Sequence, residues 1–309
     1  MKLQQLRCIF EVVQNNFNIS RAAESIHTSQ PGVSKQIQVL EEEIGVQIFH
    51  RNGKRLTGLS EPGLRVYESI AEIMREVKNI KNISEEYEKK DSGSFTIATT
   101  HTQARYKLPV VVESFVKKYP KINLNIHQGN PSQVTEQILN GDADVGIATE
   151  SISLNNKIFC IPCYSWNRCL VMQKDHPLLL VKDITLKDLA SYPMITYDYA
   201  FTGSTIVSKV FKEANINPNI MLTAIDADVI KTYVSLNLGV GLIAEMAFDE
   251  NKDKNLVSRD VSHLFPTSTT YIGVRQDTFI RGFTFDFISM FTPHMEEKEL
   301  KIFLKKRHV

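Results

Sequence analysis

The segment TSQPGVSKQIQVL, residues 28–40, combines the features that start a helix with the periodicity that buries one of its faces. Ser29 can cap the helix, and Pro31 suits the first turn because the N–H that proline lacks would be unpaired there anyway. Apolar residues then recur at intervals of four and three: Val33, Ile37 and Leu40. The segment therefore predicts a helix with one apolar face and one polar face.

The residues on either side place this helix in a helix-turn-helix. Upstream, Ser20 is a good N-cap for a short helix over residues 21–26, and residues 3–13 predict an earlier amphipathic helix. A helix, a short turn and a polar-faced helix form the helix-turn-helix arrangement. Downstream, the basic and turn-rich tip of residues 50–55 lies between two short extended segments. We interpret this tip as a wing.

The exposed side chains of this region predict contacts with double-stranded DNA. Amide, hydroxyl and ammonium groups on the third helix can pair with base edges in a major groove, while hydroxyls at its start and cations of the wing can contact phosphate. The candidate DNA-binding residues are Thr28, Ser29, Gln30, Pro31, Ser34, Lys35, Gln38, Arg51, Lys54 and Arg55. The alternative is a small helical dimerisation domain with a solvated polar face.

Length and composition describe an ordinary globular chain. The 309 residues suggest about two domains, and 36 Lys plus Arg against 35 Asp plus Glu leave a formal charge of +1. This balance excludes disorder and an all-over polycation, so nucleic-acid binding must come from a local basic patch. The sequence lacks an apolar run long enough for a membrane helix and the apolar core of a signal peptide, and four cysteines are too few for a disulfide framework. We expect a cytoplasmic protein without membrane contact.

A heptad-like pattern after the wing predicts a long linker helix. Its apolar residues recur at intervals of four, three, four and three: Val66, Ile70, Ile73, Val77 and Ile80. This seam favours dimerisation; the alternative is an amphipathic helix docked on its own domain. The polar run of residues 84–93 is interpreted as a linker. We expect a DNA-binding domain over residues 1–60, a linker and dimerisation helix over 61–91, and an effector-binding domain over 92–309.

From residue 94 onward, apolar extended runs alternate with amphipathic helical ones, which predicts an α/β module with mainly parallel sheets. The predicted strands cover residues 94–98, 122–128, 144–148, 168–173, 193–196 and 221–224, with a further buried strand that ends near residue 243. The predicted helices cover residues 103–118, 131–139, 205–214 and 228–237.

Hydroxyl-rich strand ends in this module predict a pocket for an anion. Residues 98–105 (ATTHTQAR) lead from a strand directly into a helix, whose first N–H groups lack internal partners and carry the positive end of the helix dipole. Thr149 follows another strand, and residues 202–205 (TGST) form a further strand-to-helix turn. Open α/β sheets bind ligands beyond the carboxyl ends of their strands, so the three turns favour one pocket. For each threonine alone, plain N-capping is the alternative; His101 is either a pocket donor or an interfacial polar residue.

Two closely spaced cysteines, Cys160 and Cys163, raise the hypothesis of a thiol-redox or zinc site. No second close pair of ligands accompanies them in the sequence, so we expect buried structural thiols. The sequence contains no Gly-rich phosphate loop, nucleophile elbow or metalloprotease motif. We therefore expect neither catalysis nor a resident metal or cofactor. A thiol-redox enzyme and a solute-binding protein with an added dimerisation domain are the alternatives to a regulator.

The motifs resemble those of LysR-type transcriptional regulators over nearly the whole chain. The runs MKLQQLRCIFEVV and TSQPGVSKQIQVLEEEIGVQIF, with the basic wing, are similar to the DNA-binding domain of the family. The runs TTHTQARYKLP, GIATE and DADVIKTYVSLNLGVGLIAEMA resemble the effector domain of one branch, the cysteine-regulon activators and their close paralogues for sulfonate use.

The resemblance implies an α+β winged helix-turn-helix domain, a long linker helix, and an α/β effector domain of two subdomains like those of periplasmic binding proteins. Subdomain I would comprise residues 92–163 and 269–309, and subdomain II residues 164–268. The resemblance also implies a dimer through the linker helix, a homotetramer, and a possible contact with RNA polymerase.

A small effector between the subdomains is implied as well, and in this branch it is sulfate, O-acetylserine or N-acetylserine. The positions that match the family's effector contacts are Thr100, Thr102, Gln103, Thr149, Trp166 and Thr202. No matching basic residue is present, which would leave an anion held by neutral donors. Cys160 and Cys169 depart from the branch, as does Glu61 after the wing.

We therefore expect a cytoplasmic activator of genes for cysteine biosynthesis and sulfur assimilation. The alternative within the branch is a regulator of sulfonate use that senses another sulfur metabolite, such as adenosine phosphosulfate.

Overall fold

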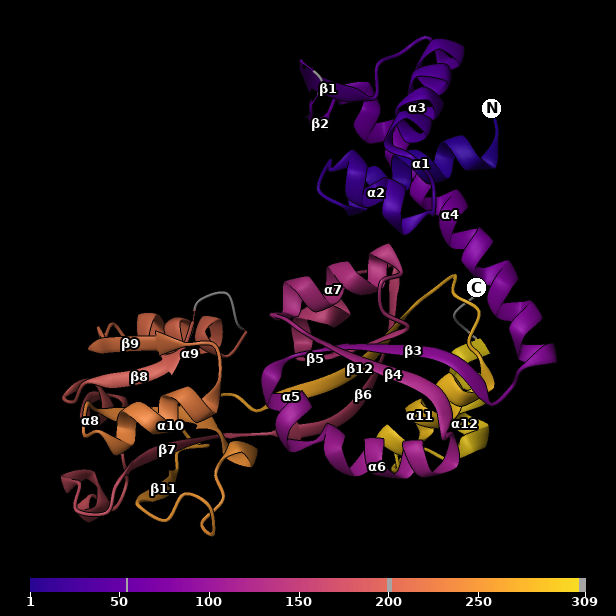
Figure 1. The fold of residues 1–309 in the computed structure, drawn as a ribbon. Coiled ribbons are helices and arrows are strands. Elements are labelled where there is room, and N and C mark those ends of the chain that lie inside the picture. Colours follow the sequence, from indigo (N-terminus) through magenta and orange to yellow (C-terminus); the bar gives the residue numbers. More distant parts are fainter. Residues whose placement is uncertain (54, 199–201, 306–309) are drawn as a thin grey trace. The chain divides into compact units, whose positions relative to one another are not determined.

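The computed structural model describes residues 1–53, 55–198 and 202–305, without the side chains of residues 202–205 and 305. The chain divides into two compact units, Met1–Glu88 and Lys89–Val309. Figure 1 shows the helices and strands of each unit. None of the helices in the described part of the chain is both long and apolar enough to cross a membrane.

The first unit contains the helix-turn-helix and the wing, which confirms the predicted fold. Its elements are α1 (Leu3–Gln14), α2 (Ile19–Ser25), α3 (Gln30–Ile44), β1 (Phe49–Asn52), β2 (Arg55–Leu59) and α4 (Glu61–Glu88). The helices share one apolar core, to which α3 contributes Val33, Ile37 and Leu40. Strands β1 and β2 pair antiparallel to form the wing.

Side-chain caps set where the two helices of the helix-turn-helix begin. The Ser29 hydroxyl accepts a hydrogen bond of 3.2 Å from the backbone N–H three residues on, which confirms the cap predicted for α3. The cap predicted at Ser20 is wrong. Helix α2 already begins at Ile19, because the Asn18 side chain caps it by accepting a 3.1 Å hydrogen bond from the Arg21 N–H.

Helix α4 has a docked first half and an exposed second half. Val66 and Ile70 pack into the core of the first unit, as the docked-helix alternative predicted. Later apolar side chains on the same helix are between 39% and 81% exposed: Ile73, Ile80, Ile83 and Tyr87. The helix continues through Glu88, so the first half of the polar run of residues 84–93 is part of the linker helix expected over residues 61–91. That run holds neither glycine nor proline before Gly93, and its Glu and Lys residues favour helix.

The second unit contains two five-stranded sheets (Figure 1). The first sheet has the spatial order β4 (Lys121–Gln128), β3 (Ser92–Thr99), β5 (Val145–Ala148), β12 (Ser268–Arg275) and β6 (Ile158–Trp166). The second has the order β11 (Leu256–Asp260), β7 (Arg168–Gln173), β10 (Val240–Ala244), β8 (Met194–Tyr197) and β9 (Ile220–Ala224).

Both sheets are mixed, so the prediction of mainly parallel sheets is wrong. Each sheet has two parallel and two antiparallel strand pairs. Every antiparallel pair contains β7 or β12, and the sequence analysis predicted β5, β7 and β10 but not β6, β11 or β12. The two-sheet α/β architecture itself is confirmed.

The helices of the second unit surround these sheets. They are α5 (His101–Tyr106), α6 (Leu108–Lys118), α7 (Pro131–Asn140), α8 (Leu186–Ala190), α9 (Thr202–Glu213), α10 (Ala227–Ser235), α11 (Gly282–Phe291) and α12 (Glu297–Lys305), with 3-10 turns η1 (Glu150–Leu154), η2 (Pro177–Leu180) and η3 (Glu245–Ala247). The single helix predicted over residues 103–118 is wrong, since α5 and α6 are separated at Lys107. The break follows from Pro109, which has no N–H to bond the carbonyl of Arg105.

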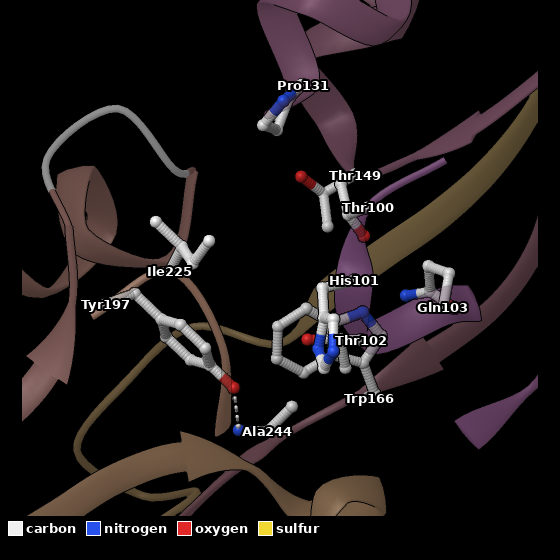
Figure 2. Close-up of a pocket in the computed structure, with 10 residues that line it drawn as sticks. All are labelled: Thr100, His101, Thr102, Gln103, Pro131, Thr149, Trp166, Tyr197, Ile225 and Ala244. Atoms are coloured by element: carbon white, nitrogen blue, oxygen red, sulfur yellow. Dashed lines mark hydrogen bonds between the residues drawn. The ribbon is translucent and has the colours of Figure 1, made fainter. Parts of the chain in front are cut away.

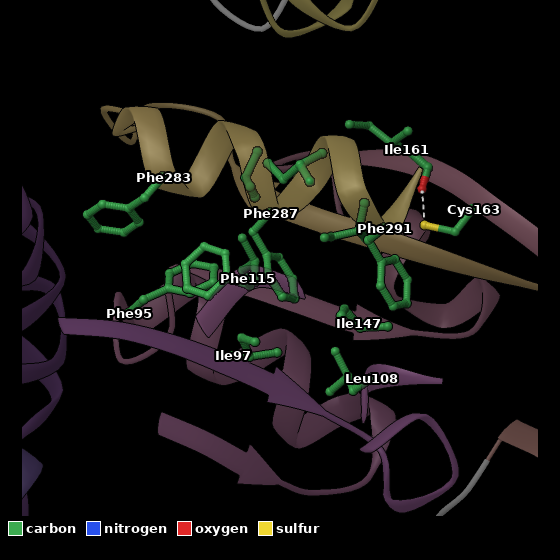
Figure 3. Packing of buried hydrophobic residues seen from close by; sticks show 14 of the residues in the cluster. Phe95, Ile97, Leu108, Phe115, Ile147, Ile161, Cys163, Phe283, Phe287 and Phe291 are labelled. Carbon is green, nitrogen blue, oxygen red and sulfur yellow. Dashed lines mark hydrogen bonds between the residues drawn. The ribbon is translucent and has the colours of Figure 1, made fainter. Parts of the chain in front are cut away.

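An aromatic core fixes the strand that carries much of the candidate site. Phe95 on β3 packs against Phe115 of α6 and Phe287 of α11, with ring centroids 5.4 and 5.0 Å apart. Figure 3 shows α11 placing Phe283, Phe287 and Phe291 over this cluster. Because buried aromatic pairs favour a few defined geometries, this packing holds β3 and its carboxyl end in place.

Two neighbouring strands connect the two sheets. β6 ends at Trp166 and β7 begins at Arg168, while the chain returns to the first sheet at Ser268 in β12. Ser268 lies opposite Trp166 in the antiparallel β6–β12 pair. The Arg168 guanidinium donates a 3.1 Å hydrogen bond to the Ser268 hydroxyl, so the outgoing and returning crossings are tied together.

Candidate functional site

The polar side of α3 forms the surface that the sequence predicted for DNA. Thr28, Gln30, Pro31, Lys35 and Gln38 are exposed, and Ser34 is half-buried among them; we call these six residues the α3 face. A groove of about 830 Å³ runs along it, lined among others by Pro31, Ser34, Lys35, Gln38 and Arg51. Ser29 lies beside it with its hydroxyl engaged in the helix cap.

Two carboxylates that the sequence analysis did not select organise the groove. Glu41 accepts hydrogen bonds from the backbone N–H groups of Ile48 and Phe49 at 2.8 and 3.2 Å, and its other oxygen pairs with Arg51 at 2.8 Å. Gln38 donates to Glu42 at 2.8 Å. These carboxylates therefore orient groups predicted to contact DNA.

The remaining wing candidates are only partly described. Arg55 is exposed at the start of β2. Lys54 lies outside the described residues. Because the Arg51 guanidinium is paired with Glu41, the predicted phosphate contact would require Arg51 to share its donors.

A second site lies where strand ends of both sheets converge in the second unit. We call it the strand-end cavity; Figure 2 shows its lining residues, Thr100, His101, Thr102, Gln103, Pro131, Thr149, Trp166, Tyr197, Ile225 and Ala244. They follow or end β3, β5, β6, β8, β9 and β10, or begin α5 and α7. The cavity volume is about 40 Å³, and a water needs roughly 10–15 Å³ measured the same way, so the space suits a few waters or one small ligand group.

Five of the six predicted effector residues line this cavity. They are Thr100, Thr102, Gln103, Thr149 and Trp166. The sixth, Thr202, begins α9, and its side chain lies outside the described residues. The geometry thus brings together residues from positions 100 to 166 that belong to separate elements.

One of these residues has an unmet hydrogen bond. Thr149 is 8% exposed, and its buried hydroxyl oxygen has no hydrogen-bond partner among the residues that the structure describes. A buried hydroxyl without a partner costs free energy, because it gave up its water contacts on folding. Thr149 therefore presents an open donor and acceptor at the cavity wall.

Two further lining residues are anchored from behind. Gln103 Nε2 and Trp166 Nε1 each donate a 3.2 Å hydrogen bond to the hydroxyl of Thr270 on β12. The Tyr164 hydroxyl donates to Gln103 Oε1. Thr270 and Tyr164 were not among the predicted site residues, since their role depends on β12 pairing with β6.

Tyr197 is a cavity residue that the sequence analysis missed. It ends β8, and its hydroxyl accepts a 3.2 Å hydrogen bond from the Ala244 N–H. Burial raises the pKa of Tyr197 to about 12, so the phenol keeps its proton at neutral pH. The same rule about carboxyl ends of strands that selected Thr149 could have selected Tyr197, because a strand was predicted directly before it.

The charge around the cavity differs in two ways from expectation. Helix α5 has only six residues, so the dipole expected from a helix reaching residue 118 is much reduced. A cation is present behind the wall. Arg168 is 2% exposed, and its guanidinium lies 5.1 Å from the centroid of the Trp166 ring and donates to the Pro266 carbonyl at 3.2 Å.

Helices α5 and α10 face each other beside the cavity through a polar cluster that we call the α5–α10 clasp. Asp228 accepts from the Tyr106 hydroxyl at 2.7 Å and pairs with Arg105 and Lys231 at 3.2 and 3.4 Å. One potential metal-ligand atom from each of His101, Asp226 and Asp228 lies within 4.8 Å of the others. The cations already bound to Asp228 would repel a metal ion, so the cluster fits an ion-pair contact between the helices.

The cysteines lie in settings that disfavour a thiol pair. Cys160 packs with Val134 and Ile138, whereas Cys163 belongs to the aromatic core on the other side of the first sheet. Burial raises the pKa of Cys160, Cys163 and Cys169 to about 12, which keeps the thiols protonated and unreactive. All four cysteines are free.

Comparisons with known proteins agree with this architecture. Residues 3–64 match the model of the bacterial regulatory helix-turn-helix of the lysR family, and residues 88–296 match the LysR substrate binding domain. The chain is 46% identical to the HTH-type transcriptional regulator SsuR of Burkholderia cenocepacia, covering 99% of each chain. It is 44% identical to the regulator CysB of the same organism, over 99% of this chain and 97% of that one.

A solved structure is similar as well. The crystal structure of the cofactor-binding domain of the Cbl transcriptional regulator superposes with a TM-score of 0.65 at 37% identity, covering 68% of this chain and 92% of that one. The helix-turn-helix, the two-sheet module and these matches over nearly the whole length lead to one assignment: the chain belongs to the LysR family of bacterial transcriptional regulators, with an N-terminal DNA-binding domain and a C-terminal effector-binding domain.

Proposed function

We propose that this regulator activates genes of sulfur assimilation and cysteine biosynthesis and that a small sulfur-related anion or acetylserine controls it from the strand-end cavity. The similarity to CysB supports the gene class, because the sequence motifs resemble the cysteine-regulon branch. The proposal assigns the chain no catalysis and no resident cofactor. A promoter-binding regulator of this kind would act in the cytoplasm, where the DNA lies.

One observation supports the effector site above all others. Thr100, Gln103 and Thr149 come from two different strand ends, are each at most 8% exposed, and line the same cavity. Hydroxyl and amide groups suit an oxyanion or carboxylate, which offers several acceptors in a small volume. The Thr149 hydroxyl, which bonds none of the described side chains, would gain a partner in such a ligand.

The size of the cavity favours a small effector over a nucleotide. A volume of about 40 Å³ suits sulfate or one end of acetylserine better than the much larger adenosine group. The alternative, a sulfonate-use regulator that senses adenosine phosphosulfate, would require the cavity to open substantially.

For DNA, we propose that the α3 face enters the major groove. Gln30, Ser34, Lys35 and Gln38 would read base edges. The other candidates, Thr28, Ser29, Pro31, Arg51, Lys54 and Arg55, would contact or lie against the phosphate backbone. Glu41 supports the proposal by holding the wing against the end of α3.

For assembly, we propose a dimer through α4 and a homotetramer of two such dimers. The exposed apolar side chains of α4 beyond Ile70 support the dimer contact: Ile73, Ile80, Ile83 and Tyr87. Effector binding would shift the subdomains across the cavity and so change the spacing of the DNA-binding domains, because a ligand shifts an arrangement only through different affinities for its states. RNA polymerase would be the downstream partner.

A calorimetric titration tests the effector site. The full-length protein is titrated with sulfate, O-acetylserine, N-acetylserine and adenosine phosphosulfate, together with Thr149→Val. Loss of the hydroxyl should weaken binding of the preferred small effector by about 1–3 kcal/mol. The control Thr223→Val alters an exposed threonine on β9 and should bind as the unaltered protein does. Equal binding by Thr149→Val would place the effector elsewhere, and tightest binding of adenosine phosphosulfate would favour the sulfonate-use alternative.

A further inference from the structure

A ring of hydrogen bonds lies behind the strand-end cavity and joins four side chains. Trp166 and Gln103 both donate to the Thr270 hydroxyl oxygen at 3.2 Å, and Tyr164 donates to Gln103 Oε1. The Thr270 hydroxyl also bonds the Tyr164 phenol. Gln103 and Thr270 are at most 1% exposed, so these bonds form away from bulk water.

The direction of each bond follows from what the groups can do. An indole N–H only donates, so the Thr270 oxygen must accept from Trp166. That oxygen also accepts from Gln103, which fills both of its lone pairs and leaves its proton for Tyr164. Tyr164 in turn donates a hydrogen bond from its hydroxyl to Gln103 Oε1. The direction of every hydrogen bond in the ring is therefore fixed.

One hydrogen-bonding group of Gln103 takes no part in this ring. The carbonyl oxygen is engaged by Tyr164 and one amide hydrogen by Thr270, while the second amide hydrogen has no partner in the ring. Figure 2 shows the Gln103 nitrogen on the side of the other lining residues. Gln103 thus offers the cavity a donor.

We propose that Tyr164 and Thr270 are positioning residues that lock the Gln103 amide as a donor, so that the cavity selects a fully deprotonated oxyanion over one that retains a proton. This inference rests on the proposed effector site and specifies its ligand class. Threonine hydroxyls in the cavity rotate and can donate or accept, whereas the locked amide cannot adapt. Gln103 is therefore the member of the site that reads the protonation state of the ligand.

Sulfate and hydrogen phosphate test this because they have the same shape and, at about pH 8, the same double negative charge, but only phosphate carries a proton. Calorimetric titration of the full-length protein should give at least about tenfold tighter binding of sulfate. Turning Gln103 into an acceptor with Gln103→Glu should reverse the preference, because a carboxylate accepts the phosphate proton and repels sulfate. Acidification should restore sulfate binding to Gln103→Glu as the carboxylate becomes protonated.

Tyr164→Phe tests the lock itself. The variant keeps the ring that packs near Phe291 but removes the hydroxyl that fixes the amide, so Gln103 can turn over. We expect the ratio of sulfate to phosphate affinity to fall about tenfold while the melting temperature stays close to that of the unaltered protein. The matched control is Ser165→Ala, which removes the exposed neighbouring hydroxyl of β6 and should leave the ratio unchanged.

The outcomes distinguish the positioning of the Gln103 amide from the effector site itself. Sulfate binding with an unchanged ratio in Tyr164→Phe, or no preference in the unaltered protein, would overturn the lock and leave the effector site in place. Absence of binding by either anion and by both acetylserines would overturn the site and the lock together.

Discussion

The α3 face and the strand-end cavity use similar side chains, hydroxyls and amides, in opposite physical settings. Gln30, Lys35 and Gln38 are exposed on α3, whereas Gln103 and Thr149 are almost fully buried. Exposed groups exchange water for a ligand at little cost, so affinity there depends mainly on charge and salt. Buried groups have already lost their water, so each hydrogen bond made or missed in the cavity carries more weight. The difference predicts that ligand binding depends mainly on charge and salt at the α3 face, and mainly on individual hydrogen bonds in the strand-end cavity.

The largest expected effect runs against this contrast, because the residue concerned, Glu41, lies beneath the exposed α3 face. Glu41→Ala removes a carboxylate that accepts from two backbone N–H groups and from Arg51, and we expect a loss of about 3 kcal/mol in the free energy of unfolding of the first unit. Chemical denaturation followed by circular dichroism measures it. The control Glu43→Ala alters an exposed carboxylate on the same helix and should cost under about 0.5 kcal/mol. A cost for Glu41→Ala as small as that of the control would show that the wing does not depend on this carboxylate.

Lys35→Ala tests the exposed face directly. Lys35 is exposed on α3, and we expect operator binding to weaken by about 1–3 kcal/mol. The slope of log affinity against log salt, measured by fluorescence anisotropy, distinguishes its role. A phosphate contact lowers the slope by about 0.9 and weakens all sequences alike, while a base contact weakens the operator selectively. An unaltered affinity for every duplex would remove Lys35 from the interface.

Thr102→Ala tests the strand-end cavity. The Thr102 hydroxyl lines the cavity and hydrogen-bonds Tyr197, so its loss should weaken effector binding by about 1.5 kcal/mol. Calorimetry at two salt concentrations should give the same difference, since a neutral hydroxyl donor is hardly screened. A difference that disappears at high salt would contradict the contrast between the two sites.

The smallest effect concerns the α5–α10 clasp and has a defined pH dependence. Burial opposes ionisation of Asp228, but hydrogen bonds from Tyr106 and Lys231 and the charge of Arg105 outweigh it and lower the pKa of the carboxyl. A lowered pKa in the folded state stabilises the protein above the unfolded value of about 3.9, and the gain is lost as pH falls through the folded value.

Because Asp228 is partly exposed, Asp228→Asn should cost on the order of 1 kcal/mol or less at neutral pH. Melting temperatures of the variant and the unaltered protein should converge as the pH falls through the lowered pKa of the folded carboxyl. A gap that stays constant across this range would mean that the carboxylate charge contributes nothing to the clasp.

Features set by local chemistry were predictable from the sequence, and those set by distant pairing were not. The spacing of three apolar residues predicted the buried face of α3: Val33, Ile37 and Leu40. The positions of Thr100 and Thr149 predicted strand ends, which the structure brings into one cavity. The break before Pro109 also has a local cause, because proline lacks the N–H that would continue the helix.

Other features depend on contacts that no local pattern encodes. The pairing of Arg51 with Glu41 crosses ten residues and depends on how the wing folds back. Strands β6 and β12 pair across about a hundred residues, and they bring Thr270 behind Gln103. The sequence therefore indicated which residues line the cavity but not what holds them.

The position of β12 has a consequence for how the protein is made. In the first sheet β12 lies between β5 and β6, yet it leaves the ribosome about a hundred residues after them, behind the whole second sheet. Until β12 is synthesised, the edges of β5 and β6 that face its place have no partner strand, and other strands can pair with them instead. The second sheet, by contrast, can close as soon as it is synthesised. The cavity, which needs residues of both sheets, is therefore among the last features to form, and a nascent chain cannot respond to an effector before its synthesis is nearly complete.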